Sequence, residues 1–167
     1  MPNSNTRFYT PDSGDALYRR SLYTFWKRSA PPPVLEIMNA PTREQCTVRR
    51  ERTNTPLQAL LTMNAPGFVE AARFLAYNAM GASDEFDVRL DYMTERLLAR
   101  RFESREREIA SAAYKDYLSH YQDSAADAAG LLAVGKSVIA TADPSADYAA
   151  LTMLANQLLN LDEVLNK

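Results

Sequence analysis

The sequence predicts an all-α fold, an irregular bundle of about six helices with a proline-rich, basic segment wrapped across it. Three observations lead to this prediction. Apolar residues recur at helical spacing through most of the second half of the chain. Prolines and polar capping residues stand where these runs begin. About three residues separate two of the predicted helices, and so short a connection requires an antiparallel αα-hairpin.

The N-terminal part should start as coil and then form one helix. Residues 1–14 are polar and are expected to be a disordered or linker lead, which leaves 15–167 as a single α-helical domain. Ser13 is a candidate N-cap for a helix that runs to about Arg28. Its apolar face follows three-four spacing. That face comprises Tyr18, Leu22, Phe25, Trp26 and Ser29. The triple proline at 31–33 should end this helix.

Residues 34–54 are the least helical part, and the sequence VLEIM is consistent with a short extended segment. A clear helix start follows, with Thr55 as N-cap and Pro56 at the first helical position. That helix should be short, because Pro66 starts another one, which is expected to reach about Met80 and to be capped by Gly81. Its inward residues are predicted to be Phe68, Ala71, Ala72, Leu75 and Ala76.

The second half of the chain has the clearest helical pattern. A helix near 84–100 is predicted from the stripe Phe86, Leu90, Met93 and Leu97. Ser104 should cap the next helix, to about Tyr121, with inward residues Ile109, Ala113, Tyr117 and Leu118. A weaker helix spans about 124–134 and ends at Gly135. The last begins near Ser145, and its heptad seam is Leu151, Leu154, Leu158, Leu161 and Leu165.

The charge of the chain is unevenly distributed. From Arg19 to Arg52 there are eight basic and three acidic residues, a net charge of +5. The whole chain is −2, so the remainder is −7. Such asymmetry indicates that the two parts pair, or that one face meets an acidic partner. Because the total charge is negative, nucleic acid is not an expected partner.

The composition excludes several kinds of site. One Cys and one His cannot form an internal disulfide or a four-ligand zinc site. The C-x-x-C-H motif for covalent haem is absent, as are a Gly-rich phosphate loop and a G-x-S-x-G elbow. No cofactor is therefore expected in this chain. No apolar run approaches the roughly 18 residues of a membrane span, and the polar start contains no signal peptide.

Three segments resemble a known family. LYRRSLYTFWKRSAPPP, CTVRRERTNTPLQALLTMN and the closing ANQLLNLDE are similar to a module of planctomycete multidomain proteins. This module is called domain of unknown function 1553, or PSD-one. The resemblance runs from about Tyr9 to Leu165 and implies the C-terminal portion of a longer module. It also implies an exported, extracytoplasmic protein associated with a cytochrome-c-like region, and it implies no established activity.

The candidate site lies in the basic segment. Arginine binds carboxylate, phosphate or sulfate through two parallel hydrogen bonds, and aromatic residues stack on sugars. The candidate anion-binding or partner-binding residues are Arg19, Arg20, Trp26, Lys27, Arg28, Arg49, Arg50, Arg52 and Asn54. The alternative is structural: the arginines pair with Glu36, Glu44, Glu51 and the acidic second half, Trp26 belongs to the core, and Asn54 caps a helix.

No catalytic residues are predicted. Cys46 lacks a neighbouring base and is expected to be a small buried residue, since the single His120 lies in another helical region. Asp162 and Glu163 diverge on a helix and do not form a shared acid site. We therefore expect a non-catalytic interaction module that docks on upstream domains of its own protein or on an anionic glycan. The alternative is part of a polysaccharide-acting enzyme whose acids come from upstream or from Glu36, Glu44 and Glu51.

Overall fold

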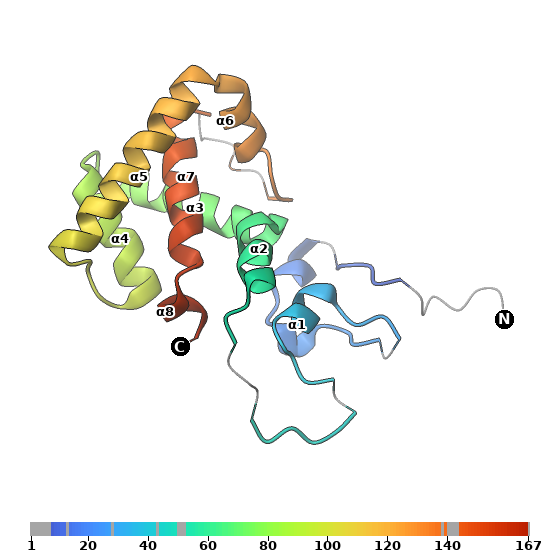
Figure 1. Ribbon diagram of the computed structural model, residues 1–167. Helices are drawn as coiled ribbons and strands as arrows, with labels where there is room; N and C mark the ends of the chain where they lie inside the picture. Colours follow the sequence, from blue (N-terminus) through green and yellow to red (C-terminus); the bar gives the residue numbers. More distant parts are fainter. Residues whose placement is uncertain are drawn as a thin grey trace. The chain divides into compact units, whose positions relative to one another are not determined.

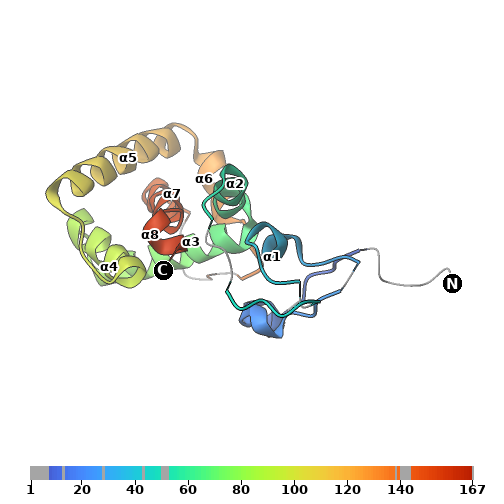
Figure 2. The ribbon, with the colours of Figure 1, turned by 60° about the horizontal axis from the view of Figure 1, so that its bottom comes forward.

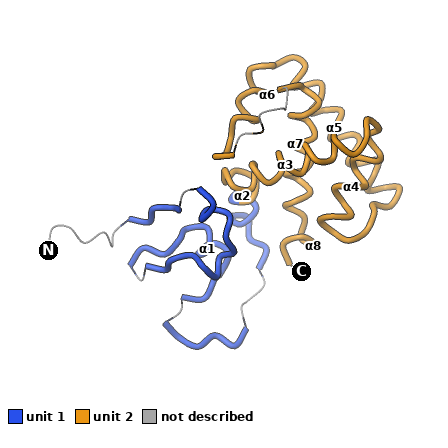
Figure 3. Tube along the Cα trace, turned by 180° about the vertical axis from the view of Figure 1, so that it is seen from behind, with its two compact units in different colours: residues 1–61 blue, residues 62–167 orange. Residues whose placement is uncertain are grey.

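The computed structural model describes residues 8–12, 14–27, 29–42, 44–49, 53–137, 139 and 144–166. Within them the all-α prediction is confirmed. They form eight α-helices, six of them longer than seven residues, and no β-strand (Figure 1). The chain divides into two compact units, residues 1–61 and 62–167 (Figure 3).

The predicted helix from Asp15 to Arg28 is wrong. In its place are two short 3₁₀ segments, Gly14–Tyr18 and Ser21–Tyr23, and Lys27 forms an isolated antiparallel bridge with Ala30. An isolated helix of this length is marginal in water unless its apolar face is packed. Here three of the five residues of that face, Tyr18, Leu22 and Phe25, are more than half exposed, so the face is not packed as a helix would need. Ser13 and Arg28 lie outside the described residues.

The triple proline starts a helix as well as ending a segment. Pro33 occupies the first position of α1 (Pro33–Ile37), so most of the VLEIM stretch is helical and not extended. Proline suits this position because it supplies a helical φ and needs no hydrogen-bond acceptor. The helix ends in a Schellman motif, with Asn39 in the left-handed region (φ 54°). Asn39 N donates to Glu36 O at 3.0 Å and Ala40 N to Leu35 O at 2.8 Å.

The second helix, α2 (Pro56–Asn64), begins where the sequence predicts. The backbone N of Ala59 donates to the Thr55 carbonyl at 3.1 Å, which makes Thr55 the capping residue before Pro56. The proline at 66 then starts the next helix, as predicted.

The second unit is a helical bundle built around α7 (Ala146–Leu159). The other helices of this unit are α3 (Pro66–Ala82), α4 (Phe86–Leu98), α5 (Ser104–Asp123), α6 (Ala125–Leu132) and α8 (Asp162–Leu165). Helices α3 to α6 surround α7 (Figure 2). Nine residues of α7 are buried, so it is the central helix of the unit.

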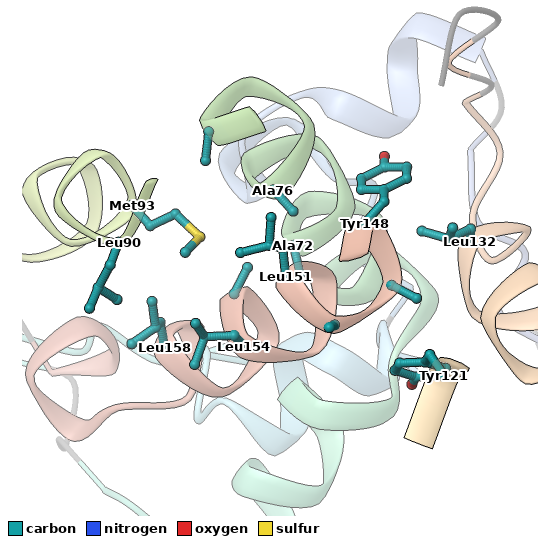
Figure 4. Packing of buried hydrophobic residues seen from close by; sticks show 14 of the residues in the cluster. Ala72, Ala76, Leu90, Met93, Tyr121, Leu132, Tyr148, Leu151, Leu154 and Leu158 are labelled. Carbon is teal, nitrogen blue, oxygen red and sulfur yellow. The ribbon is translucent and has the colours of Figure 1, made fainter. Parts of the chain in front are cut away.

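One apolar core holds the bundle together. Ala72 and Ala76 of α3 lie beside the leucines of α7, and their small side chains let the two helices approach closely (Figure 4). Ala79 belongs to the same cluster. Leu90 and Met93 of α4 are completely buried, and Phe86 and Leu97 pack against the core, which confirms the stripe predicted for this helix. Tyr121 of α5 and Leu132 of α6 complete the core.

Several helix ends and faces differ from prediction. Gly81 lies inside α3, which ends at Ala82 with Ser83 as its C-cap. Ser104 is the first residue of α5, and Glu103 is its N-cap, because Glu103 and Glu106 form a reciprocal capping box. Ala71 and Ile109 are exposed, since the buried face of each helix is set one residue further on, at Ala72 and Ala110.

The leucine seam of the last helix is shorter than predicted. Leu151, Leu154 and Leu158 are buried as expected, but the helix ends at Leu159. Leu161 precedes α8 and is 37% exposed. The break is stabilised at Asn160, whose Oδ1 accepts a hydrogen bond from Thr62 Oγ1 at 2.6 Å. This contact anchors the C-terminal end of α2 on the bundle and replaces further helical packing.

Candidate functional site

The first unit is organised by a polar node around Gln58. The Gln58 side chain is buried (4% exposed), and its Nε2 donates to Ile37 O at 2.9 Å and to Thr53 Oγ1 at 2.8 Å. Its Oε1 accepts from Thr55 N at 3.0 Å, and Gln58 N donates to Thr55 Oγ1 at 3.3 Å. Asn39 Nδ2 also donates to Thr53 Oγ1, at 2.6 Å. The node joins α1, the segment before α2, and α2 itself.

Arg19 and Arg20 lie on the surface of this unit. Both are exposed, and neither forms an ion pair with a described residue. The guanidinium of Arg20 lies over the Tyr23 ring, 6.0 Å from its centroid. This position follows from the local backbone, because residues three apart share a side in a 3₁₀ turn. Neither guanidinium is therefore used by a carboxylate of the described chain.

Trp26 and Lys27 are half-buried. Lys27 Nζ donates to the carbonyl of Phe8 at 3.1 Å, so it ties the N-terminal stretch to the turn at Lys27–Ala30. The prediction of a core Trp26 is met only in part, because this unit provides little apolar packing around it. Arg28, from the predicted site, lies outside the described residues.

The second half of the predicted site is a surface stretch. Arg49 is exposed and forms no ion pair with a described residue, and Asn54 is exposed too. Arg50, Glu51 and Arg52 lie outside the described residues. Cys46 is exposed, which corrects the prediction of a buried thiol: this stretch has no apolar core to bury it. No described contact joins Arg49 to Arg19 or Arg20.

Most arginines of the second unit are engaged in ion pairs. Arg100 donates to both oxygens of Glu106 at 2.9 Å and to Glu163 at 3.1 and 2.9 Å. These hydrogen bonds, those with Glu106 first, raise the pKa of Arg100 above its usual value. The bond from Arg100 in turn lowers the pKa of Glu106 to about 2. Arg101 and Arg107 also pair with acids of α4.

A partly buried tie joins three helices of the second unit at Asp147. The Asp147 carboxylate, in the first turn of α7, accepts from Arg89 at 2.8 Å and from the Tyr114 hydroxyl at 2.6 Å. Burial first, and then the bond to Asp147, raises the pKa of Tyr114. These charge-assisted bonds hold the start of α7 against α4 and α5.

A second buried polar pair lies on α3. Arg73 is 6% exposed and donates to the carbonyls of Leu132, at 2.7 Å, and of Ser137. Glu70 is 5% exposed, and its Oε2 accepts from Lys136 N at 2.7 Å. Together they fasten the chain after α6 to the bundle.

Sequence reasoning missed these residues for identifiable reasons. Gln58 had a signal, since Thr55-x-x-Gln58 matches the capping-box pattern. Glu70 and Arg73 had none, because charged residues are almost never fully buried, and nothing in the sequence pattern marks these two as exceptions.

The metal-ligating and acidic residues of the described chain lie apart from one another or on the surface. No group of three or more His, Cys, Asp or Glu residues among them is placed to hold a metal ion. Glu36 and Glu44 are both exposed. His120 is exposed, with its Nε2 3.6 Å from Asp127. None of the helices in the described part of the chain combines the length and apolar character needed to cross a membrane.

The comparisons with known proteins identify the class of protein. A family model described as "PSD1: Protein of unknown function (DUF1553)" matches residues 1–114. This match covers more than half of the chain, including the whole first unit and α3 and α4 of the second. The chain therefore belongs to the DUF1553 family. Neither the curated proteins nor the solved structures gave a match.

Proposed function

We propose that the chain is a non-catalytic interaction module, and that residues 8–61 form its docking surface for an anionic partner. The partner class is an upstream domain of the same protein or an anionic glycan. The setting we propose is an exported, extracytoplasmic, multidomain protein associated with a cytochrome-c-like region, and it rests on the family resemblance.

A single observation supports the docking surface. The described arginines of the first unit, Arg19, Arg20 and Arg49, are exposed without ion pairs, whereas four arginines of the second unit are paired. Exposed guanidinium groups that have no internal carboxylate retain their capacity for bidentate bonds to a partner. Counted over its whole sequence, the first unit has nine basic and five acidic residues, a net charge of +4.

The test is binding of defined polyanions to the full chain. Labelled poly-glutamate and heparin are titrated with wild type, with Arg19→Ala/Arg20→Ala and with a matched control, Arg96→Ala/Arg105→Ala. Arg96 and Arg105 are exposed residues of the second unit without ion pairs, so both double variants remove the same charge. We expect the first variant to weaken binding roughly tenfold, a loss of about 1.4 kcal/mol, and the control to change it little.

The outcomes distinguish a binding site at Arg19 and Arg20 from nonspecific electrostatic attraction of the polyanion to the protein surface. Binding should also weaken with salt, because exposed charges are screened over about 8 Å at physiological ionic strength. Equal losses in the two double variants would mean that any surface arginine serves, and the proposal would then be wrong. Melting temperatures of both variants should stay close to wild type, since neither removes a buried contact.

A further inference from the structure

The first unit has almost no apolar interior. Its buried residues, in the described part, are Pro32 and Gln58. The buried hydrophobic residues of the described chain run from Val69 to Leu158, all in the second unit. Polar bonds around Gln58 therefore organise the first unit where an apolar core would normally do so.

The same unit exposes large apolar side chains in one contiguous stretch. Within Tyr18–Phe25, Tyr23 is 62% exposed and Phe25 is 72% exposed, and the exposed Arg19 and Arg20 stand beside them. The full set of large apolar residues in this stretch with more than half of their surface exposed is Tyr18, Leu22, Tyr23 and Phe25. Tyrosine, phenylalanine and arginine are the residues enriched in protein–protein interfaces. A stretch of this composition fits a polypeptide partner with apolar side chains better than it fits a purely polar ligand.

We propose that Tyr18–Phe25 docks an acidic polypeptide segment bearing aromatic or aliphatic side chains. This inference rests on the proposed function and names its partner class. Charge complementarity argues for the acidic component, since the first unit is +4 and Arg19 and Arg20 have no internal carboxylate. The exposed Leu22 argues for the apolar component, because it has no ring face on which a sugar could stack, whereas an aromatic or aliphatic side chain would cover both it and the neighbouring Phe25.

The positions of Arg20 and Phe25 suit a partner that carries both carboxylates and apolar side chains. Arg20 lies over one face of the Tyr23 ring, so the ring keeps the guanidinium in place through a cation–π contact. The guanidinium edge remains open for a carboxylate. Phe25 lies two residues further along the chain. Its ring, unlike that of Tyr23, holds no guanidinium of a described residue, so it contributes only apolar surface.

The experiment compares three defined probes with the full chain. These are poly-glutamate, a glutamate–tyrosine copolymer of similar length and charge, and heparin, each followed by fluorescence anisotropy. We expect the copolymer to bind roughly tenfold more tightly than poly-glutamate, since each aromatic contact adds to the charge term. Its advantage should persist at higher salt, where purely ionic binding falls.

Variants assign the two components to residues. Phe25→Ala should remove most of the copolymer's advantage while leaving poly-glutamate binding unchanged. Arg19→Ala/Arg20→Ala should weaken all three probes. The matched control is Ile109→Ala, which removes an apolar side chain that is 63% exposed in the second unit, and it should have no effect.

Three results would overturn the inference. Heparin binding that equals or exceeds that of the copolymer, and that Phe25→Ala does not change, would assign the surface to a glycan and leave the proposed function standing. Self-association of the chain that Phe25→Ala abolishes, seen by sedimentation, would make a second copy the occupant. Failure of all three probes to bind would remove both the inference and the proposed function.

Discussion

At the scale of single residues, Gly135 is a position that no other residue can fill without strain. Its φ of +107° is a conformation that L side chains rarely adopt, and a Cβ built there would lie 2.9 Å from Glu70 Cβ and closer still to the Glu70 carboxylate. Glu70 is buried and bonded to Lys136 N, so it cannot easily move aside. Gly135→Ala should therefore destabilise the second unit by about 1–3 kcal/mol, measured by urea unfolding.

The chain offers an opposite control at Gly130. This glycine lies inside α6, and a Cβ there would meet nothing within 4 Å. Alanine is preferred to glycine in a helix interior, so Gly130→Ala should stabilise the protein by about 0.5–1 kcal/mol. If Gly135→Ala and Gly130→Ala shifted the free energy of unfolding in the same direction, the close approach of Glu70 would not be the reason why position 135 requires glycine.

Tyr148 makes stability depend on alkaline pH. It is buried, and its hydroxyl donates to Arg73 O at 3.1 Å. Burial raises the pKa of Tyr148 from 10.0 to about 12. Above pH 10 the unfolded chain loses this proton while the folded chain keeps it, so stability is complete below pH 10 and falls as the pH rises towards 12.

The check on Tyr148 is the slope of unfolding free energy against pH. Tyr148→Phe should flatten this slope between pH 10 and 12, although it also removes one hydrogen bond and so lowers stability at neutral pH. Tyr9→Phe is the matched control, because Tyr9 lies in the first unit, outside the core. An unchanged slope in Tyr148→Phe would show that this tyrosine does not retain its proton on folding.

At the scale of elements, Arg100 fastens α8 to the turn between α4 and α5. Glu106 belongs to α5 and Glu163 to α8, and both accept bonds from this one guanidinium. The bond from Arg100 holds the pKa of Glu106 at about 2, below its usual 4.5. A depressed pKa stabilises the fold above pH 4.5, and that contribution is lost as the pH falls towards 2.

The Glu106 side-chain carbon shift in NMR reports this titration directly. Its midpoint should rise towards the ordinary value in Arg100→Lys, because lysine keeps the charge but cannot form two parallel bonds to each carboxylate. High salt should raise the midpoint as well, since these groups are exposed. A wild-type midpoint near 4.5 would contradict the bidentate geometry.

The elements also show what the sequence can and cannot predict. Helices α3 to α7 could be predicted because each has apolar residues that pack on a partner helix. Pro56 and Pro66 mark the starts of α2 and α3. The helix predicted over 15–28 has an equally regular stripe, but Tyr18, Leu22 and Phe25 of that stripe are each more than half exposed. Periodicity thus predicts the face that a helix would bury, whereas helix formation depends on tertiary packing.

The candidate site was predictable only in outline. Arginine enrichment located the exposed cations at Arg19, Arg20 and Arg49. It did not reveal the polar node at Gln58, because the capping-box pattern points only to a local bond with Thr55 and not to the bonds from Gln58 Nε2 to Ile37 O and Thr53 Oγ1. Nor did it show that Cys46 is exposed, since thiols are among the most often buried groups.

At the scale of the whole molecule, the apolar core is confined to one of the two units. The described core residues lie between Ala72 and Leu158, within the unit of residues 62–167. The only Trp, Trp26, lies in the other unit. Regions with few buried apolar contacts open at lower free energy than a packed core. The long helices α3, α4, α5 and α7 will therefore dominate far-UV circular dichroism, while Trp26 fluorescence reports the first unit alone.

This separation predicts two transitions in urea. Trp26 emission should change at a lower urea concentration than the signal at 222 nm, so the two curves should not coincide. Met93→Ala, which removes a fully buried side chain, should cost about 2–5 kcal/mol and move only the circular dichroism curve. Coincident curves that both shift in Met93→Ala would instead mean one cooperative domain over residues 15–167, because coincidence of independent probes is the mark of two-state unfolding. The first unit would then unfold only together with the bundle. Its exposed aromatic residues would be held in place without a bound partner.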